Sequence, residues 1–150
     1  MSIRHPYDRS VHAIHYDAYP DPAAGVGYII LLPEMSRIQI VSVEFTLTTA
    51  IAVADRFVYV APSTLPQEHL HLYAERNQAA SLAFLYSGYM GAPNENGIAP
   101  LATRVRIPLG VDLIFDNVDS IIITADNLQA ADQFTNLYIY YNYWHTGQLP

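Results

Sequence analysis

Apolar and polar side chains alternate along much of the chain, and the alternation is clearest at residues 37–49. The apolar positions there are Val41, Val43, Phe45 and Leu47, with Ser, Glu or Thr residues between them. A period of two places the apolar side chains on one face, which is typical of a β-strand with one buried side. The sequence therefore predicts a strand over residues 37–49.

Similar alternation, or a short run of β-branched and aromatic residues, marks further strands along the chain. They are expected at residues 27–32, 54–61, 68–74, 79–86, 101–108, 111–115, 118–126 and 134–144. Residues 79–86 could also form two helical turns, but the run is short and has no cap, so a strand is expected. Residues 88–100, rich in Gly, Asn and Pro, are expected to form a long exposed loop.

These elements predict an all-β protein, because no amphipathic helix of useful length occurs between them. Eight of these nine segments are counted as main strands, and eight strands with turn signals roughly every ten to fifteen residues are typical of a β-sandwich. Eight strands in two sheets is also the number found in a jelly roll. We therefore expect an eight-stranded antiparallel β-sandwich, jelly-roll-like, over residues 26–150, with a short C-terminal tail.

Residues 1–25 are rich in His, Tyr, Asp and Pro and show no sustained period. Residues 11–16 could pair as a short strand, but Pro20 and Pro22 favour an extended N-terminal arm. Such an arm has no apolar stripe to bury, so we expect it to become ordered against a neighbouring subunit or another protein. Its expected contact residues are His12, His15, Tyr16 and Tyr19.

The last two expected strands, residues 118–126 and 134–144, flank a polar connector and predict a pair of strands joined by a loop. The core-facing positions are expected to be Ile121, Ile123 and Ala125 in the first strand and Leu137, Ile139, Tyr141 and Tyr143 in the second. The opposite face of the second strand carries Tyr138, Tyr140 and Trp144. A strand with apolar or aromatic residues on both faces is covered on both, so these three are expected at an interface.

Composition and charge narrow the classes of function. The chain of 150 residues is long enough for one domain, and 51% of its residues are apolar while 14% are charged. It has no cysteine, which excludes disulfides and thiolate chemistry. Its seven basic residues are all arginine and face fourteen acids, so the net charge of −7 disfavours nucleic-acid partners. No run suits a membrane span or a signal peptide, and neither is expected.

One pattern resembles a metal site. His69 and His71 lie two residues apart on an expected strand, so their side chains share a face, and Glu75 follows as a third possible ligand. The spacing is similar to the first metal motif of cupins, and residues 108–110 resemble part of the second. Leu113, however, occupies the position of the remaining cupin histidine. We expect no metal, no cofactor and no catalytic residues, with a cupin-like metal-dependent enzyme as the alternative.

The scarcity of charge and the abundance of tyrosine match the composition of protein interfaces. Twelve tyrosines and one tryptophan occur in 150 residues. Tyrosine, tryptophan and arginine are enriched where proteins bind one another. The same tyrosines could instead close a sandwich core with their hydroxyl groups in water. The amino-acid composition is compatible with both interpretations.

Two segments resemble small virion structural proteins of tailed bacteriophages. They are Leu-Thr-Thr-Ala-Ile-Ala-Val-Ala-Asp-Arg at residues 47–56 and Asn-Leu-Gln-Ala-Ala-Asp-Gln at residues 127–133. In that group a long strand ends in a Leu-Thr-Thr-like segment before an arginine-headed strand, and the second loop leads into a strand ending in tryptophan, here Trp144. The resemblance covers about residues 38–144. Ala131 departs from it, because related loops favour glycine there.

The resemblance implies a jelly-roll cement, or decoration, protein that stabilises the major capsid protein on the outer capsid surface. It also implies a homotrimer, assembly in the host cytoplasm, and no contact with nucleic acid or membrane. A tail, neck or fibre-attachment component of the virion is the alternative within the same class.

Overall fold

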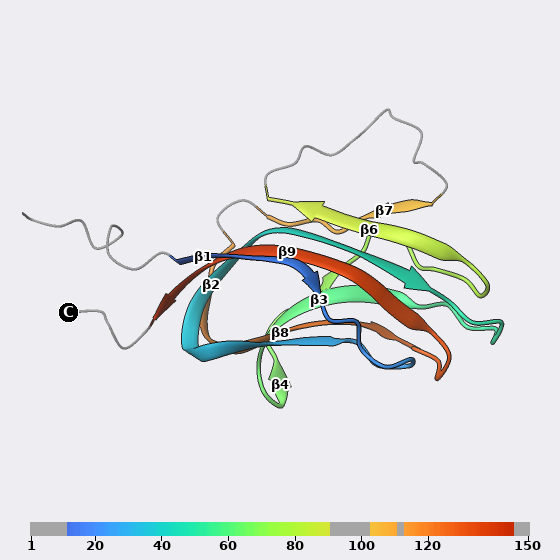
Figure 1. The fold of residues 1–150 in the computed structure, drawn as a ribbon, viewed down its shortest axis with the longest axis horizontal. Coiled ribbons are helices and arrows are strands. Elements are labelled where there is room, and N and C mark those ends of the chain that lie inside the picture. The colour runs from blue at the N-terminus through green and yellow to red at the C-terminus, as the bar shows by residue number, and fades with distance from the viewer. Residues whose placement is uncertain (1–11, 91–102, 111–112, 146–150) are drawn as a thin grey trace, which may run out of the picture.

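The computed structural model describes residues 12–90, 103–110 and 113–145, without the side chains of residues 12–18, 33–36, 143 and 145 (Figure 1). These residues contain no helix and form nine strands of one mixed, open sheet. The strands are β1 (His12–Tyr19), β2 (Tyr28–Thr48), β3 (Phe57–Thr64), β4 (Gln67–Glu68), β5 (Leu72–Tyr73), β6 (Ala83–Tyr89), β7 (Arg104–Arg106), β8 (Phe115–Asp126) and β9 (Gln133–His145). The expected all-β class is confirmed.

Strand β2 is the element that the rest of the sheet is built on. It is 21 residues long, and its first part, residues 28–38, pairs with β8. Its second part pairs with β9 over residues 36–48 and with β6 over residues 42–48. The main path of the sheet is β1-β9-β2-β8-β3-β4. Figure 1 shows β2 curving, so that its two parts lie in different layers.

Both parts of the sheet bury their apolar side chains in one core. Tyr28, from the first part of β2, packs edge-on against Phe134 of β9, with ring centroids 6.0 Å apart. Phe45, from the second part, stacks on Tyr86 of β6 at 5.3 Å. Val58 and Val60 of β3 face the same cluster and are almost fully buried. The alternation read from the sequence therefore identified core positions from both parts of the sheet.

Two β-bulges set which residues face this core. Ile40 pairs with Tyr141 and Ser42 with Tyr140, so Val41 is an extra residue on β2. Val41 was expected to share the core face, but it is only half-buried because the bulge changes the parity at this point. On β9 the extra residue is Asn136, whose φ of 55° is one that asparagine tolerates well.

The pairing of the two long C-terminal strands differs from the expectation. Strands β8 and β9 were expected to pair with each other, but β2 lies between them, and each pairs with a different part of it. The alternation predicted the buried faces of both strands correctly, since Ile121, Ile123 and Leu137 are fully buried. Alternation reports which side of a strand is covered, and it does not report which strand is the neighbour.

Other strand boundaries also differ from those expected from the sequence. The strands expected at residues 27–32 and 37–49 are one strand that runs through Pro33, where the register with β8 is irregular. Residues 68–74 split into β4 and β5. The strand expected over residues 79–86 is present as β6, but it begins at Ala83 and ends at Tyr89. Strand β7 pairs with β6 in parallel, so neither a count of eight nor a fully antiparallel sheet is confirmed.

Part of the segment expected as an N-terminal arm is an edge strand. In β1, the backbone of His12 lies opposite Tyr143 and that of His15 opposite Tyr140. Residues 1–11 lie outside the described part of the chain. Whether residues 1–25 behave as a unit separate from the domain stays a prediction.

Candidate interaction surface

The outer face of β9 carries the aromatic side chains expected there. Tyr138 is 42% exposed, and Tyr140 and Trp144 are half-buried on the same side of the strand. Leu137 and Tyr141 point the other way and are fully buried. The three aromatic side chains thus lie opposite the core, as the alternation indicated, and their contact with another protein stays a prediction.

Strand pairing brings tyrosines from two strands together around an acid. Glu44 of β2 lies opposite Tyr138 of β9, and Ser42 lies opposite Tyr89 of β6. Directly opposed residues project to the same side of a sheet, so all four share the outer face. They border a pocket of about 190 Å³ lined by Ser42, Val43, Glu44, Tyr89, Tyr138 and Ile139. We call this the β2 pocket.

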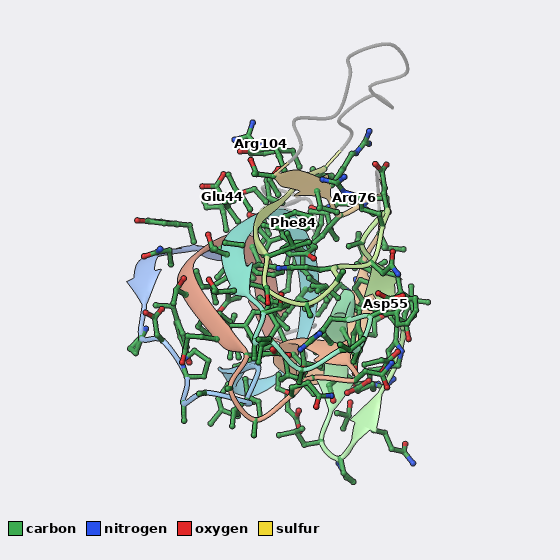
Figure 2. All side chains as sticks on the ribbon, turned by 90° about the vertical axis from the view of Figure 1, so that its right-hand side faces the viewer. Glu44, Asp55, Arg76, Phe84 and Arg104 are labelled. Atoms are coloured by element: carbon green, nitrogen blue, oxygen red, sulfur yellow. The ribbon has the colours of Figure 1, made fainter. Side chains whose placement is uncertain are left out.

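The loop between β2 and β3 exposes two aliphatic side chains at one end of the molecule. Ile51 is 87% exposed and Val53 is 98% exposed. The same end carries the β8–β9 connector and the turn before β2, to the right in Figure 1. Figure 2 looks onto this end and labels Asp55, which belongs to the loop. Exposed aliphatic side chains close together on a loop are a feature of contact surfaces.

A buried ion pair fixes this loop to the β8–β9 connector. Arg56 Nε donates to Asp132 Oδ2 at 2.8 Å, and Nη2 donates to Oδ1 at 2.9 Å, while neither side chain is exposed to solvent. Arg56 Nη1 also donates to the backbone oxygens of Ala52, at 3.0 Å, and Ala54. Asp132 Oδ1 accepts from the Ala50 amide at 2.7 Å. This two-pronged geometry orders the loop that carries Ile51 and Val53.

Gln78 extends the same network to the segment before β6. The backbones of Gln78 and Arg56 exchange two hydrogen bonds of 2.9 and 3.0 Å. The Gln78 side chain donates to the carbonyl oxygens of Leu47 and Leu82, both at 2.9 Å, and accepts from the Tyr86 hydroxyl at 2.8 Å. Three segments that are distant in sequence are therefore tied to one buried arginine.

The ion pair also sets the acid–base behaviour of Asp132. Burial by itself raises the pKa of this carboxyl, but hydrogen bonds from Arg56 and from the Ala50 and Gln129 amides outweigh burial. The pKa of Asp132 is therefore held below its ordinary value of 3.8. A carboxyl group whose pKa is lowered on folding stabilises the folded state at pH values above its ordinary pKa. This contribution to stability is lost as the pH falls through the lowered pKa.

The Arg56–Asp132 pair was not predicted from the sequence, although both segments that carry it were singled out for their resemblance to virion proteins. One signal was present. Arg56, Val58 and Val60 are spaced two residues apart, so their side chains project to the same side of the strand, and the two valines face the core. An arginine in phase with buried valines needs a buried acid as a partner.

The β8–β9 connector also contains Ala131, where related loops favour glycine. Ala131 is not among the described residues with positive φ, and Asn127 has the positive φ in this connector, at 62°.

The two histidines of the candidate metal site have different partners. His69 Nε2 forms a hydrogen bond with Thr64 Oγ1 at 2.7 Å. His71 pairs with Glu68 and stacks on Tyr59, with ring centroids 4.3 Å apart. Burial and the negative charge of Glu68 raise the pKa of the Tyr59 hydroxyl. His71 thus belongs to a small aromatic and acidic cluster over β3.

Glu75, the third candidate ligand, faces Arg106 instead, with 3.8 Å between Oε1 and Nε. No group of three or more His, Asp or Glu side chains in the described ranges is arranged to hold a metal ion. The structure therefore does not bring His69, His71 and Glu75 together.

The expected contact residues of the arm can be placed in part. Tyr19 is half-buried beside the core, with its ring edge-on to Tyr28 at 6.1 Å and its hydroxyl donating to the Ile29 carbonyl at 3.3 Å. His12, His15 and Tyr16 are placed by backbone alone: they lie in β1, where Tyr16 is opposite Ile139 of β9. An interface role for these four stays a prediction.

Removing the charge of Asp132 should destabilise the protein strongly. We expect Asp132→Asn to lower the free energy of unfolding by about 3–5 kcal/mol, because Arg56 is then a buried charge without its counter-ion. Asp116→Asn is the matched control. It breaks the Arg37–Asp116 pair, whose side chains are 37% and 56% exposed, and should cost less than about 1 kcal/mol. Urea unfolding followed by circular dichroism measures both.

The same comparison made at low pH tests the lowered pKa. Between about pH 5 and pH 2 the parent protein should lose more stability than Asp132→Asn, since the variant has no carboxylate to protonate at this site. Equal losses in the two proteins would show that Asp132 does not carry the lowered pKa.

Elemental analysis tests whether His69 and His71 are ligands. We expect protein purified without a histidine tag to contain no stoichiometric zinc, iron, manganese or nickel, since these side chains have other partners. A full equivalent of metal that is lost in His71→Ala would contradict this and favour the metal-enzyme alternative.

Comparison with known proteins gave no relative of this chain. A scan against protein-family models, a search of curated proteins and a search of solved structures all found no match. In the ranges that the structure describes, no helix is long and apolar enough to cross a membrane. Function is therefore inferred from the surface features described above.

Proposed function

We propose that this protein is a bacteriophage virion structural protein, and specifically a capsid cement protein that stabilises the major capsid shell through protein–protein contacts. The observation that carries the proposal is the loop between β2 and β3. It presents Ile51 and Val53 almost fully to solvent, while the buried Arg56–Asp132 pair at its base fixes its backbone. A water-exposed aliphatic pair on a loop held in one conformation suits docking onto another protein.

The resemblance to virion proteins also supports the proposal, and it involves the same two segments that the ion pair joins. Residues 47–56 contribute Arg56 and residues 127–133 contribute Asp132. The two segments are therefore in contact through these side chains. A shared pattern of this kind is expected when two loops must be held together to build one docking end.

Assignment as a capsid cement protein also implies a particular fold, oligomeric state and location, which are part of the proposal. They are a jelly-roll sandwich made of the two parts of the sheet, a homotrimer in the assembled particle, and a place on the outer capsid surface after assembly in the host cytoplasm. The protein is proposed to have no enzymatic activity. Its net charge of −7 suits binding to a protein with a basic surface better than binding to nucleic acid.

Replacing the exposed aliphatic pair should weaken docking without affecting the fold. We expect Ile51→Ser combined with Val53→Ser to change the free energy of unfolding by less than about 0.5 kcal/mol, since both side chains are exposed. Attachment to capsids assembled without the protein should fall about tenfold or more, measured by co-sedimentation. Leu70→Ser is the control, at a leucine that is 43% exposed between β4 and β5. Unchanged attachment of the double variant would remove the docking role of this loop.

The outer aromatic face of β9 gives a second test of assembly. We expect Tyr140→Ala combined with Trp144→Ala to leave the monomer folded, because both side chains lie opposite the core face. Trimer formation or capsid attachment should weaken at least about tenfold, as buried aromatic residues often dominate an interface. Circular dichroism checks the fold, and sedimentation checks assembly. Unfolding of the double variant, with a stable monomeric parent, would assign these side chains to the core instead.

A further inference from the structure

The β2 pocket combines a carboxylate with two exposed tyrosine rings. Tyr89 is 54% exposed and Tyr138 is 42% exposed, and the half-buried Glu44 lies between their strands on β2. Among the described residues, the side chains of Glu44, Tyr89 and Tyr138 make no hydrogen bond, ion pair or ring contact. All three are therefore available to a ligand.

The arginines nearest to Glu44 along the sheet do not neutralise it. Ser87 lies opposite Glu44, and Arg106 follows Ser87 in the same row, but the guanidinium of Arg106 faces Glu75 at 3.8 Å. Arg104 is opposite Leu85, in the next row, and is exposed. In the part of the chain that the structure describes, no ion pair to Glu44 is formed.

The chemistry of the pocket favours a flat cation. A half-buried carboxylate without a donor attracts positive charge, and tyrosine faces attract cations within about 6 Å of the ring centre. Neighbouring strands are about 4.8 Å apart and the rise is about 3.4 Å per residue. Tyr89 is opposite Ser42 and Tyr138 is opposite Glu44, on either side of β2, so their backbones are roughly 12 Å apart. That spacing leaves room for one planar group between two rings. A guanidinium can both stack on the rings and donate two hydrogen bonds to a carboxylate.

The size of the pocket indicates a single side chain. Its volume of about 190 Å³ is below the range of roughly 300–1,000 Å³ typical of sites for small-molecule ligands. A cofactor or drug-sized metabolite would therefore extend well outside it. One arginine side chain, carried by a protein segment lying across the outer face of β2, would not.

We propose that the β2 pocket binds an arginine side chain of the partner protein, with Glu44 as its counter-ion and Tyr89 and Tyr138 against its faces. The net charge of −7 favours a basic protein over a second copy of this chain as the source of that arginine. That the partner is the capsid protein rests on the proposed function, while binding of arginine by the pocket does not.

A short peptide tests the pocket without any virion. We would titrate acetyl-Gly-Arg-Gly-amide into the isotope-labelled full chain and follow the nuclear magnetic resonance signals of Glu44 and of the Tyr89 and Tyr138 rings. Saturable shifts at these three positions are expected. The citrulline peptide, which has nearly the same shape without the charge, should bind at least about fivefold more weakly.

Matched variants distinguish binding in the pocket from nonspecific attraction of the arginine peptide to an acidic protein. Glu44→Gln, which removes the charge and keeps the shape, should weaken binding of the arginine peptide at least about fivefold, and Tyr138→Ala should weaken it as well. Asp55→Asn is the control and should have no effect. It removes the same charge from an exposed side chain that Figure 2 places well apart from Glu44.

Several outcomes would overturn the inference. Equal binding of the citrulline peptide, unchanged binding by Glu44→Gln, or shifts centred away from the pocket would each do so. Self-association of the chain that disappears in Glu44→Gln would assign the pocket to a second copy instead. Failure of the parent protein to attach to capsids, with selective binding of the arginine peptide intact, would overturn the virion proposal and leave the pocket standing.

Discussion

The Arg56–Asp132 ion pair is the interaction on which one end of the fold depends. Strands β8 and β9 do not pair with each other, so their connector has no shared ladder to order it. Asp132 supplies that order by binding the guanidinium of Arg56 and the amides of Ala50 and Gln129. Removing one partner of such a pair leaves a buried charge uncompensated, so the pair fixes the mutual position of the two loops.

Strand β2 imposes the second constraint, because it belongs to both parts of the sheet. Its inward side chains change parity at Val41, and those of β9 change parity at Asn136. The bulges let a strand and its neighbour keep their apolar residues in the core while the sheet curves. The Asn136 amide, freed from the ladder at this point, donates to Asp21 Oδ1 at 2.9 Å. Curvature is thus paired with a specific polar contact.

How much of this could be read from the sequence depends on the physical signal involved. Period-two alternation identified the buried faces of β8 and β9, since burial acts residue by residue. It misassigned the neighbour of β8 because pairing depends on the whole sheet, and it joined Val41 to the core face because a bulge leaves no mark in the pattern. The candidate site was found in part: Tyr138 was predicted at an interface on the face opposite the core, while Glu44 was interpreted only as a polar position between core residues.

The two surfaces proposed for recognition are both attached to the most constrained parts of the molecule. The β2 pocket has Ser42, Val43 and Glu44 at its base, on a strand that is paired on both edges there by β6 and β9. Ile51 and Val53 lie between β2 and the buried Arg56. Side chains held on such supports lose little conformational freedom when they bind, so more of their contact energy remains as affinity. Glu44 and Tyr138 lie on the outer face of their strands while Phe45 and Leu137 face the core, so a substitution on the outer face can change recognition without changing the fold.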